Sequence, residues 1–213
     1  MNVKQLSEAV GGLSKPSKMP GLSYGTPAKD CIVGSILRKK AGSVCSKCYA
    51  HKGMYSFPVV RDAQAKRLAI LSANLEQWRE DMTELLRRKY SKKTGDDRVF
   101  RWHDSGDLQS TAHLSAIVKI ARSLPDIKFW LPTKEYSLVG KFCRTRKIPR
   151  NLIIRVSAPM IGSSYGPTLP GTVSSTVGAG TGFACGAYQR EGKCGDCRAC
   201  WDKSVLSVDY PQH

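Results

Sequence analysis

Cysteines at metal-ligand spacing occur in the first quarter of the chain. Cys45 and Cys48 form a Cys-x-x-Cys pair, and Cys31 lies upstream of it. A tight Cys-x-x-Cys turn puts two thiolates on one side of a loop, where they can bind zinc or an iron–sulfur cluster. We call these three residues the N-terminal cysteine group and predict that they are metal ligands.

A second, denser set of cysteines lies near the end of the chain. Cys194, Cys197 and Cys200 follow one another at Cys-x-x-Cys spacing, and Cys185 precedes them. Zinc sites usually take two ligands from each of two knuckles, so three cysteines in one knuckle favour an iron–sulfur cluster, with zinc as the alternative. We call these four residues the C-terminal cysteine group. Cys143 stands apart on a basic segment and is not predicted to bind metal.

Polar side chains follow three predicted strands at the point where each strand ends. The carboxyl ends of parallel strands lie at one edge of a sheet, where α/β proteins bind their ligands. Asp107 or Ser110 could also cap the helix that follows. The predicted ligand-binding residues are His103, Asp104, Asp107, Thr133, Lys134, Arg155 and Ser157.

The elements that must position these residues alternate between strand and helix. Runs with β propensity at 99–102, 127–131 and 152–156 are separated by helical patterns at 110–123 and 135–147. Strands separated by helices of this length predict βαβ units and a parallel sheet. The predicted fold class is therefore α/β.

The remaining segments are predicted from their composition and from the cysteine positions. The stretch at 161–184 is rich in Gly, Ser, Thr and Pro and shows no usable period. Within one domain of residues 1–213, we predict an extended lead-in at 1–30, the N-terminal cysteine loop at 31–50, a long loop at 161–184, the C-terminal cysteine knot at 185–201 and a last strand at 205–210.

Four stretches carry a resemblance to known proteins. They are KMPGLSYGTPA at 18–28, GSVCSKCYA at 42–50, WHDSGD at 102–107 and CGDCRACW at 194–201. With these stretches the chain resembles a phage family known as gene product 88 and, more distantly, the radical S-adenosylmethionine superfamily. The resemblance implies a four-iron (4Fe-4S) cluster, S-adenosylmethionine as a cofactor, and a partial or reduced TIM-like barrel built from βα units.

The superfamily resemblance also implies roles for the strand-end residues. Three cysteine ligands leave one iron of a four-iron cluster open, and the methionine part of S-adenosylmethionine would bind that iron. Asp104 or Asp107 would accept hydrogen bonds from its ammonium group. Arg155 or Lys134 would pair with its carboxylate. Ser157 would contact the ribose.

Composition and charge suggest partners and a compartment. There are 34 Lys and Arg residues against 17 Asp and Glu, a formal net charge of +17 that favours nucleic acid or another polyanion as partner. The first residues lack the apolar stretch of a signal peptide, and no run is long enough to cross a bilayer. We expect a cytoplasmic protein without membrane contact, in the host cytoplasm if a phage encodes it.

Two alternatives to an S-adenosylmethionine-dependent enzyme arise from the same residues. One is a nucleic-acid-binding protein in which both cysteine groups hold structural zinc and the positive charge contacts phosphates. The other is an electron-transfer or structural iron–sulfur protein that works with an electron donor. In that case both cysteine groups could build a single cluster if a closed barrel brought the chain ends together.

Overall fold

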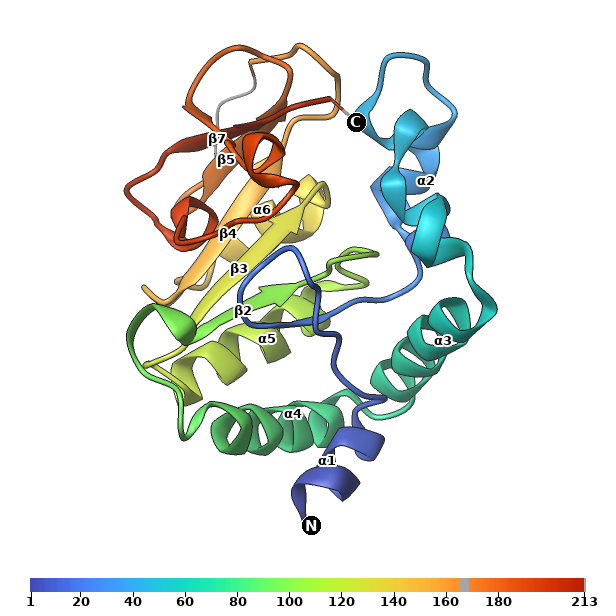
Figure 1. The fold of residues 1–213 in the computed structure, drawn as a ribbon. Helices are drawn as coiled ribbons and strands as arrows, with labels where there is room; N and C mark the ends of the chain where they lie inside the picture. The colour runs from blue at the N-terminus through green and yellow to red at the C-terminus, as the bar shows by residue number, and fades with distance from the viewer. Residues whose placement is uncertain (165–168, 213) are drawn as a thin grey trace.

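A computed structural model describes residues 1–164 and 169–212 and shows a parallel sheet with helices on one face (Figure 1). The sheet order is β1-β2-β3-β4-β5-β7-β6, and all pairs of neighbouring strands are parallel. The strands are β1 (Leu22–Tyr24), β2 (Val99–Trp102), β3 (Lys128–Thr133), β4 (Leu152–Ser157), β5 (Val173–Val177), β6 (Phe183–Ala184) and β7 (Ser207–Tyr210).

The predicted parallel sheet is confirmed, but the sheet is not closed. The three predicted strands are β2, β3 and β4, which lie side by side, with Arg101 opposite Trp130 and Trp130 opposite Ile153. The expected partial TIM-like barrel is not confirmed, because β1 and β6 form opposite edges of an open sheet. A barrel needs a helix after each strand to form its outer ring. In the described residues no α-helix follows β4.

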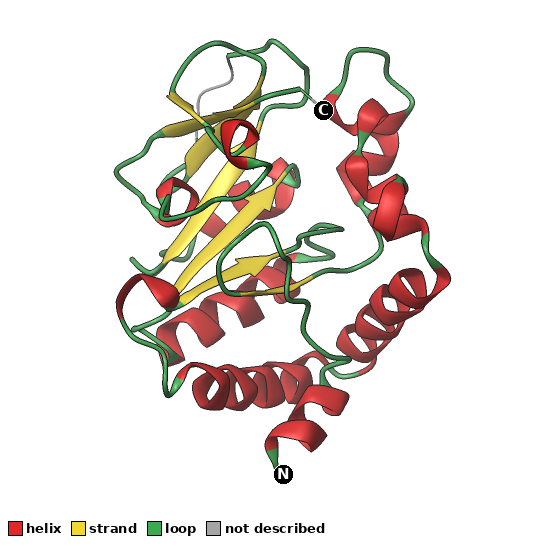
Figure 2. Cartoon of the chain, in the orientation of Figure 1, coloured by secondary structure: helices red, strands yellow, loops and turns green. Residues whose placement is uncertain are grey.

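Helices pack against one face of the sheet, as Figure 2 shows. Alternate strand residues, such as Phe100 and Trp102 of β2 and Phe129 of β3, join the main core with side chains from α4, α5 and α6. The α-helices are α1 (Val3–Ala9), α2 (Ile32–Arg38), α3 (Pro58–Ala73), α4 (Leu75–Tyr90), α5 (Thr111–Ser123) and α6 (Tyr136–Cys143). None of these helices has the length and apolar character that a membrane span requires.

The C-terminal segment covers the other face of the sheet. In Figure 1 it crosses β3 and β4 as an orange-to-red chain. Trp201 packs edge-on against Trp130 with ring centroids 5.2 Å apart, and its indole N–H donates to the Phe100 carbonyl at 2.9 Å. A small second core forms there from Val99, Trp130 and Trp201. The sheet therefore has helices on one face and cysteine-bearing loops on the other.

Short 3₁₀ turns connect the longer elements. They are η1 (Ala28–Asp30), η2 (Val44–Lys47), η3 (Tyr49–His51), η4 (Gly53–Ser56), η5 (Gly95–Asp97), η6 (Tyr188–Arg190) and η7 (Ala199–Trp201). Cys45 lies in η2 and Cys200 in η7, and Cys31 and Cys48 directly adjoin η1 and η3.

Two segments predicted as extended or loop contain regular structure. The lead-in at 1–30 includes α1, whose first turn is closed by a capping box between Asn2 and Gln5, and the edge strand β1. The predicted loop at 161–184 includes β5 and β6, and four of its residues, 165–168, lie outside the described part. β5 reads Val-Ser-Ser-Thr-Val, so it lacks the apolar pattern that marks a strand. The predicted last strand is confirmed as β7.

Candidate metal and ligand site

The N-terminal cysteine group gathers around the first turn of α2. Cys31 is the N-cap residue of α2, Cys45 lies in η2, and Cys48 ends that turn. A Cβ atom added to Gly34 would lie 3.6 Å from the Cys31 sulfur and 3.7 Å from the Cys45 sulfur, so both sulfurs border the same small space. Burial raises the pKa of the Cys31 thiol, and nearby charges, including those of Cys48 and Cys45, raise it further. The three predicted ligands are therefore neighbours.

This group lies against the carboxyl ends of β2 and β3. Asp107 and Glu135 are also among the charges that raise the pKa of Cys31. Burial raises the pKa of Cys45, and the Lys134 ammonium opposes this rise. A carboxylate of Glu135 accepts a hydrogen bond from the Val33 backbone N–H at 2.9 Å, which joins α2 to the end of β3. The predicted metal ligands and some of the predicted strand-end residues thus share one region.

Asp107 joins the ends of the two strands. Its carboxylate accepts hydrogen bonds from the Thr133 hydroxyl at 2.6 Å, the Leu108 N–H at 2.8 Å and the Lys134 N–H at 2.9 Å. Burial raises the pKa of Asp107, although these donors oppose the rise. The cap of α5 is Ser110, whose hydroxyl accepts from the His113 N–H. Asp107 therefore links two strands rather than capping a helix.

His103 and Asp104 form a tight turn directly after β2. His103 has a left-handed backbone conformation, with φ of 56°, which is rare for a residue other than glycine. Tyr49, next to Cys48, donates its hydroxyl to the Asp104 carbonyl at 2.6 Å, and Tyr55 donates to the Asp104 carboxylate at 3.3 Å. These bonds fasten the N-terminal cysteine loop to the end of β2.

Buried polar atoms without a hydrogen-bond partner gather near this turn. Buried polar groups in proteins are nearly always paired, so such a cluster marks a place suited to water or a polar ligand. The rings of His103 and His113 lie 5.3 Å apart. Within the described residues, the unpartnered atoms here are Ser23 Oγ, Thr26 Oγ1, His103 Nδ1 and Nε2, Asp104 Oδ1, Ser105 Oγ and His113 Nε2.

The C-terminal cysteine group lies on the helix-free face of the sheet. Burial raises the pKa of Cys194, and the charges of Cys185 and Cys197 raise it further. Burial also raises the pKa of Cys200 to about 11, with Cys185 among the smaller contributors. The sulfur of Cys200 lies 3.1 Å from the Tyr210 hydroxyl of β7. The four cysteines are thus brought together beside β7.

Arg155 holds this segment to the sheet. Its side chain is fully buried, and it donates five hydrogen bonds to backbone carbonyls. All of its N–H donors are used in this way, so a bound carboxylate would find no free donor on Arg155. The accepting carbonyls belong to Ser174 at 3.1 Å, Ala199 at 2.6 Å, Cys200 at 3.0 Å, Asp202 at 2.8 Å and Val205 at 2.9 Å.

Ser157 ends β4, and the chain just beyond it runs beside the N-terminal cysteine loop, where the Val44 N–H donates to the Pro159 carbonyl at 2.9 Å. It follows Arg155 by two residues on β4, and its hydroxyl accepts a hydrogen bond from the Ser175 hydroxyl at 3.0 Å. Its carbonyl accepts from the Tyr136 hydroxyl at 2.5 Å. These contacts join β4 to β5 and α6.

Arg101 connects the two cysteine regions and was not predicted as a site residue. Its guanidinium donates to the Tyr49 hydroxyl at 3.0 Å and lies over the Trp130 ring, 4.4 Å from the centroid. Its positive charge also opposes the rise in the pKa of Cys194 and of Cys200. A charged residue inside the apolar strand Val-Phe-Arg-Trp is a signal that could have identified it.

Each cysteine group gathers its own thiols. In the described part of the chain, the thiol–thiol interactions that shift these pKa values stay within each group. The open sheet removes the reason to expect the chain ends at one metal. No three His, Cys, Asp or Glu side chains of the described residues are arranged to hold a single metal ion. A tetrahedral zinc site with Zn–S bonds of about 2.3 Å requires its sulfurs to lie about 3.8 Å from one another.

Comparison with known proteins identifies a family. No curated protein and no solved structure matches the chain. The family described as Gene product 88 matches residues 2–169, which include the N-terminal cysteine group and strands β1 to β4. The match ends before the C-terminal cysteine group, so CGDCRACW at 194–201 lies outside the matched region. The chain belongs to the Gene product 88 family.

Proposed function

We propose that the protein binds iron–sulfur clusters at two separate sites, one open to a small ligand and one structural. The observation that carries the proposal is the gathering of Cys31, Cys45 and Cys48 beside Asp107 at the strand ends. Three thiolates complete the coordination of three irons in a four-iron cluster and leave the fourth iron free. We infer that this free position is the functional one.

The donor set fits such a group. Seven cysteines supply the ligand type that iron–sulfur clusters take, and no Cβ fills the space at Gly34 between the Cys31 and Cys45 sulfurs. The raised thiol pKa values mean that protons must leave when metal binds, as is general for cysteine sites. Cys31, Cys45 and Cys48 would hold the cluster.

The candidate ligand of the open site is S-adenosylmethionine. When bound, a cluster with one open iron supplies a position for the amino and carboxylate groups of this ligand and an electron that cleaves its sulfonium. Asp104 and the unpartnered atoms near it offer hydrogen bonds to a polar ligand. Lys134 is the cation available for a carboxylate, because the donors of Arg155 are already used.

The protein around the site would also orient the ligand and exclude water. His103, Asp104 and Asp107 are buried, so charges there interact in a medium less polar than water. Tyr49 and Tyr55 hold the cysteine loop against the turn after β2. The C-terminal site has four thiolates and therefore no open position, which favours a structural or electron-transfer role.

Anaerobic metal analysis followed by ligand titration tests this function. We expect purified protein to contain iron and sulfide in equal amounts and to absorb broadly near about 400 nm. Adding S-adenosylmethionine to the reduced protein should change the electron paramagnetic resonance spectrum. Asp104→Asn should keep its iron and lose this response, and Cys143→Ser should behave like wild type.

Three results would overturn the proposal in different ways. If the protein contains zinc and no sulfide, both cysteine groups hold structural zinc instead of clusters. A cluster whose spectra ignore S-adenosylmethionine would leave an electron-transfer or structural iron–sulfur protein. An unchanged response in Asp104→Asn would remove that residue from the ligand site.

A further inference from the structure

The segment around α2 carries a concentrated positive charge. Between residues 29 and 59 the sequence has one acidic residue, Asp30, and no glutamate. Figure 2 shows α2 and the short turns after it as a group beside the sheet. We call the exposed side chains of residues 29–59 the basic surface. Its cations, all exposed, are Lys29, Arg38, Lys39, Lys40, Lys47 and Lys52.

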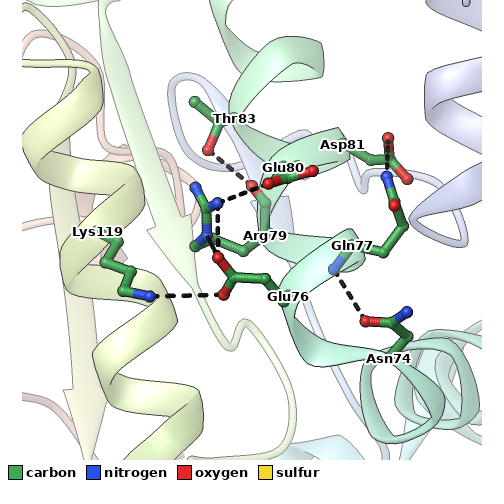
Figure 3. A network of polar contacts seen from close by, with 8 residues as sticks. All are labelled: Asn74, Glu76, Gln77, Arg79, Glu80, Asp81, Thr83 and Lys119. Carbon is green, nitrogen blue, oxygen red and sulfur yellow. Dashed lines mark hydrogen bonds and ion pairs between the residues drawn. The ribbon is translucent and has the colours of Figure 1, made fainter.

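These cations have no acidic partners, unlike Arg79 of α4 and Lys119 of α5. In Figure 3, Arg79 of α4 bonds to Glu76 at 2.8 Å and to Glu80 at 3.0 Å, and Lys119 of α5 reaches Glu76 at 3.5 Å. Among the described residues, no cation of the basic surface forms an ion pair. Its charge is therefore available to an external anion.

A pocket of about 410 Å³ lies within the basic surface. It has three cations in its lining and no carboxylate, and one of them, Arg38, lies 3.3 Å from the His51 ring. A recess with this charge fits a phosphate group. The lining residues are Ala28, Lys29, Ser35, Arg38, Lys39 and His51.

Large apolar side chains are exposed among the same cations. Phe57 is 51% exposed and Tyr49 is 43% exposed. The elements that carry them contact one another, since η1 packs on α2 and η3, and η3 packs on η4. Six of the ten exposed large apolar residues of the described chain lie here: Ile32, Ile36, Tyr49, Met54, Phe57 and Val59.

We propose that the basic surface binds single-stranded nucleic acid, with a phosphate in the pocket and bases against the exposed apolar side chains. Single strands offer regularly spaced phosphates together with unpaired bases that stack on aromatic rings. Duplex DNA exposes phosphates but keeps its bases stacked, so the apolar residues would gain little from it. This proposal does not depend on cluster chemistry, and iron content is measured separately in each variant.

Fluorescence anisotropy with a labelled single-stranded oligonucleotide of about 20 nucleotides tests this surface on the full-length protein. The test variant is Arg38→Glu with Lys39→Glu. Its matched control is Lys89→Glu with Lys92→Glu, which changes the net charge equally at the exposed end of α4. We expect at least a tenfold loss of affinity in the test variant, a smaller dependence of binding on salt, and less than a threefold loss in the control.

The apolar part of the surface has its own variant. Phe57→Ala should weaken single-strand binding about tenfold and leave the salt dependence unchanged, because stacking releases no counterions. Equal losses in the two charge variants would show that net charge alone drives binding and would overturn the proposal. Binding to phosphatidylserine vesicles without binding to the oligonucleotide would overturn it in favour of a membrane surface.

Discussion

Gly34 is the residue whose missing side chain shapes the N-terminal site. It lies in α2, where glycine costs up to about 1 kcal/mol relative to alanine. A Cβ atom there would lie 2.8 Å from the Cys31 Cβ and would fill the space beside the sulfurs of Cys31 and Cys45. Glycine therefore occupies this helix position despite its low helix propensity, because a larger residue would fill the space of the proposed metal site.

Gly34→Ala is predicted to lower the iron content without unfolding the protein. The added methyl group must displace Cys31, which it would approach to 2.8 Å, while the helix itself gains propensity. Iron and sulfide analysis after anaerobic purification measures the effect. Ser35→Ala, one residue further along α2, is the matched control and should keep wild-type iron. Wild-type iron in Gly34→Ala would show that this space is not the metal site.

At the scale of elements, a single buried arginine fixes the C-terminal segment on the sheet. Arg155 of β4 donates to two carbonyls within η7, to two after it and to one carbonyl of β5. No α-helix covers this face of the sheet in the described residues, so these bonds and the Trp130–Trp201 contact hold the segment in place.

Arg155→Lys is predicted to destabilise the protein by about 3 kcal/mol or more. Lysine keeps the charge but cannot donate in five directions, so buried carbonyls would lose their partners. Anaerobic urea unfolding measures the change. Arg122→Lys, at an exposed position of α5, removes one carbonyl contact, that to Lys147, and should cost less than about 0.5 kcal/mol. Equal stability of the two variants would contradict the anchoring role of Arg155.

His113 of α5 makes stability depend on pH. Burial lowers its pKa to about 3 from an ordinary value of 6.5. The unfolded chain therefore binds a proton between these values that the folded chain does not, and stability is lost as the pH falls below 6.5. At pH 5 this loss is about 2 kcal/mol for one histidine.

When the pH is lowered from 7.5 to 5, the free energy of unfolding of His113→Leu is predicted to fall by about 2 kcal/mol less than that of wild type. Urea unfolding at the two pH values measures this difference. Ile117→Val, also buried in α5, is the control and should keep the wild-type pH dependence at lower stability. A His113→Leu variant with the wild-type pH dependence would show that other groups control it.

The elements of this fold differ in how much the sequence reveals. The strands β2, β3 and β4 are predictable because β-prone runs alternate with helical segments. The strand β5 is not, because its Ser-Ser-Thr centre resembles a loop until β4 and β7 supply partners on both sides. The sheet stays open because, among the described residues after β4, loops replace the helices that a barrel needs.

The sequence predicts which residues lie near the candidate sites, but not the role that each of them has. Cysteine spacing predicts the seven thiols, and the strand-end rule predicts Asp107, Thr133 and Lys134 beside the first group. Sequence alone could not show that Arg155 differs in role from these residues. The face of the sheet on which its side chain lies depends on the alternation of side chains along β4, and its partners belong to a loop more than forty residues later in the chain. The position of Arg101 between two distant segments is hidden from the sequence for the same reason.

At the scale of the whole molecule, one sheet carries two cysteine sites. The N-terminal group lies at the ends of β2 and β3, and the C-terminal group lies on the helix-free face beside β7. Arg101 reaches between them through Tyr49 and Trp130. The basic surface adjoins the N-terminal group, because both occupy the segment from η1 to η4.

Iron and sulfide analysis of two triple variants tests the central claim of two separate iron–sulfur sites. One variant combines Cys31→Ser, Cys45→Ser and Cys48→Ser, and the other combines Cys194→Ser, Cys197→Ser and Cys200→Ser. Both are purified without oxygen and compared with wild type and with Cys143→Ser, after cooperative unfolding shows that each is folded. We predict equal iron and sulfide in every sample, about four of each per intact site, so each triple variant keeps about half of the wild-type content. Zinc without sulfide, or complete loss of iron from both folded variants, would contradict the claim.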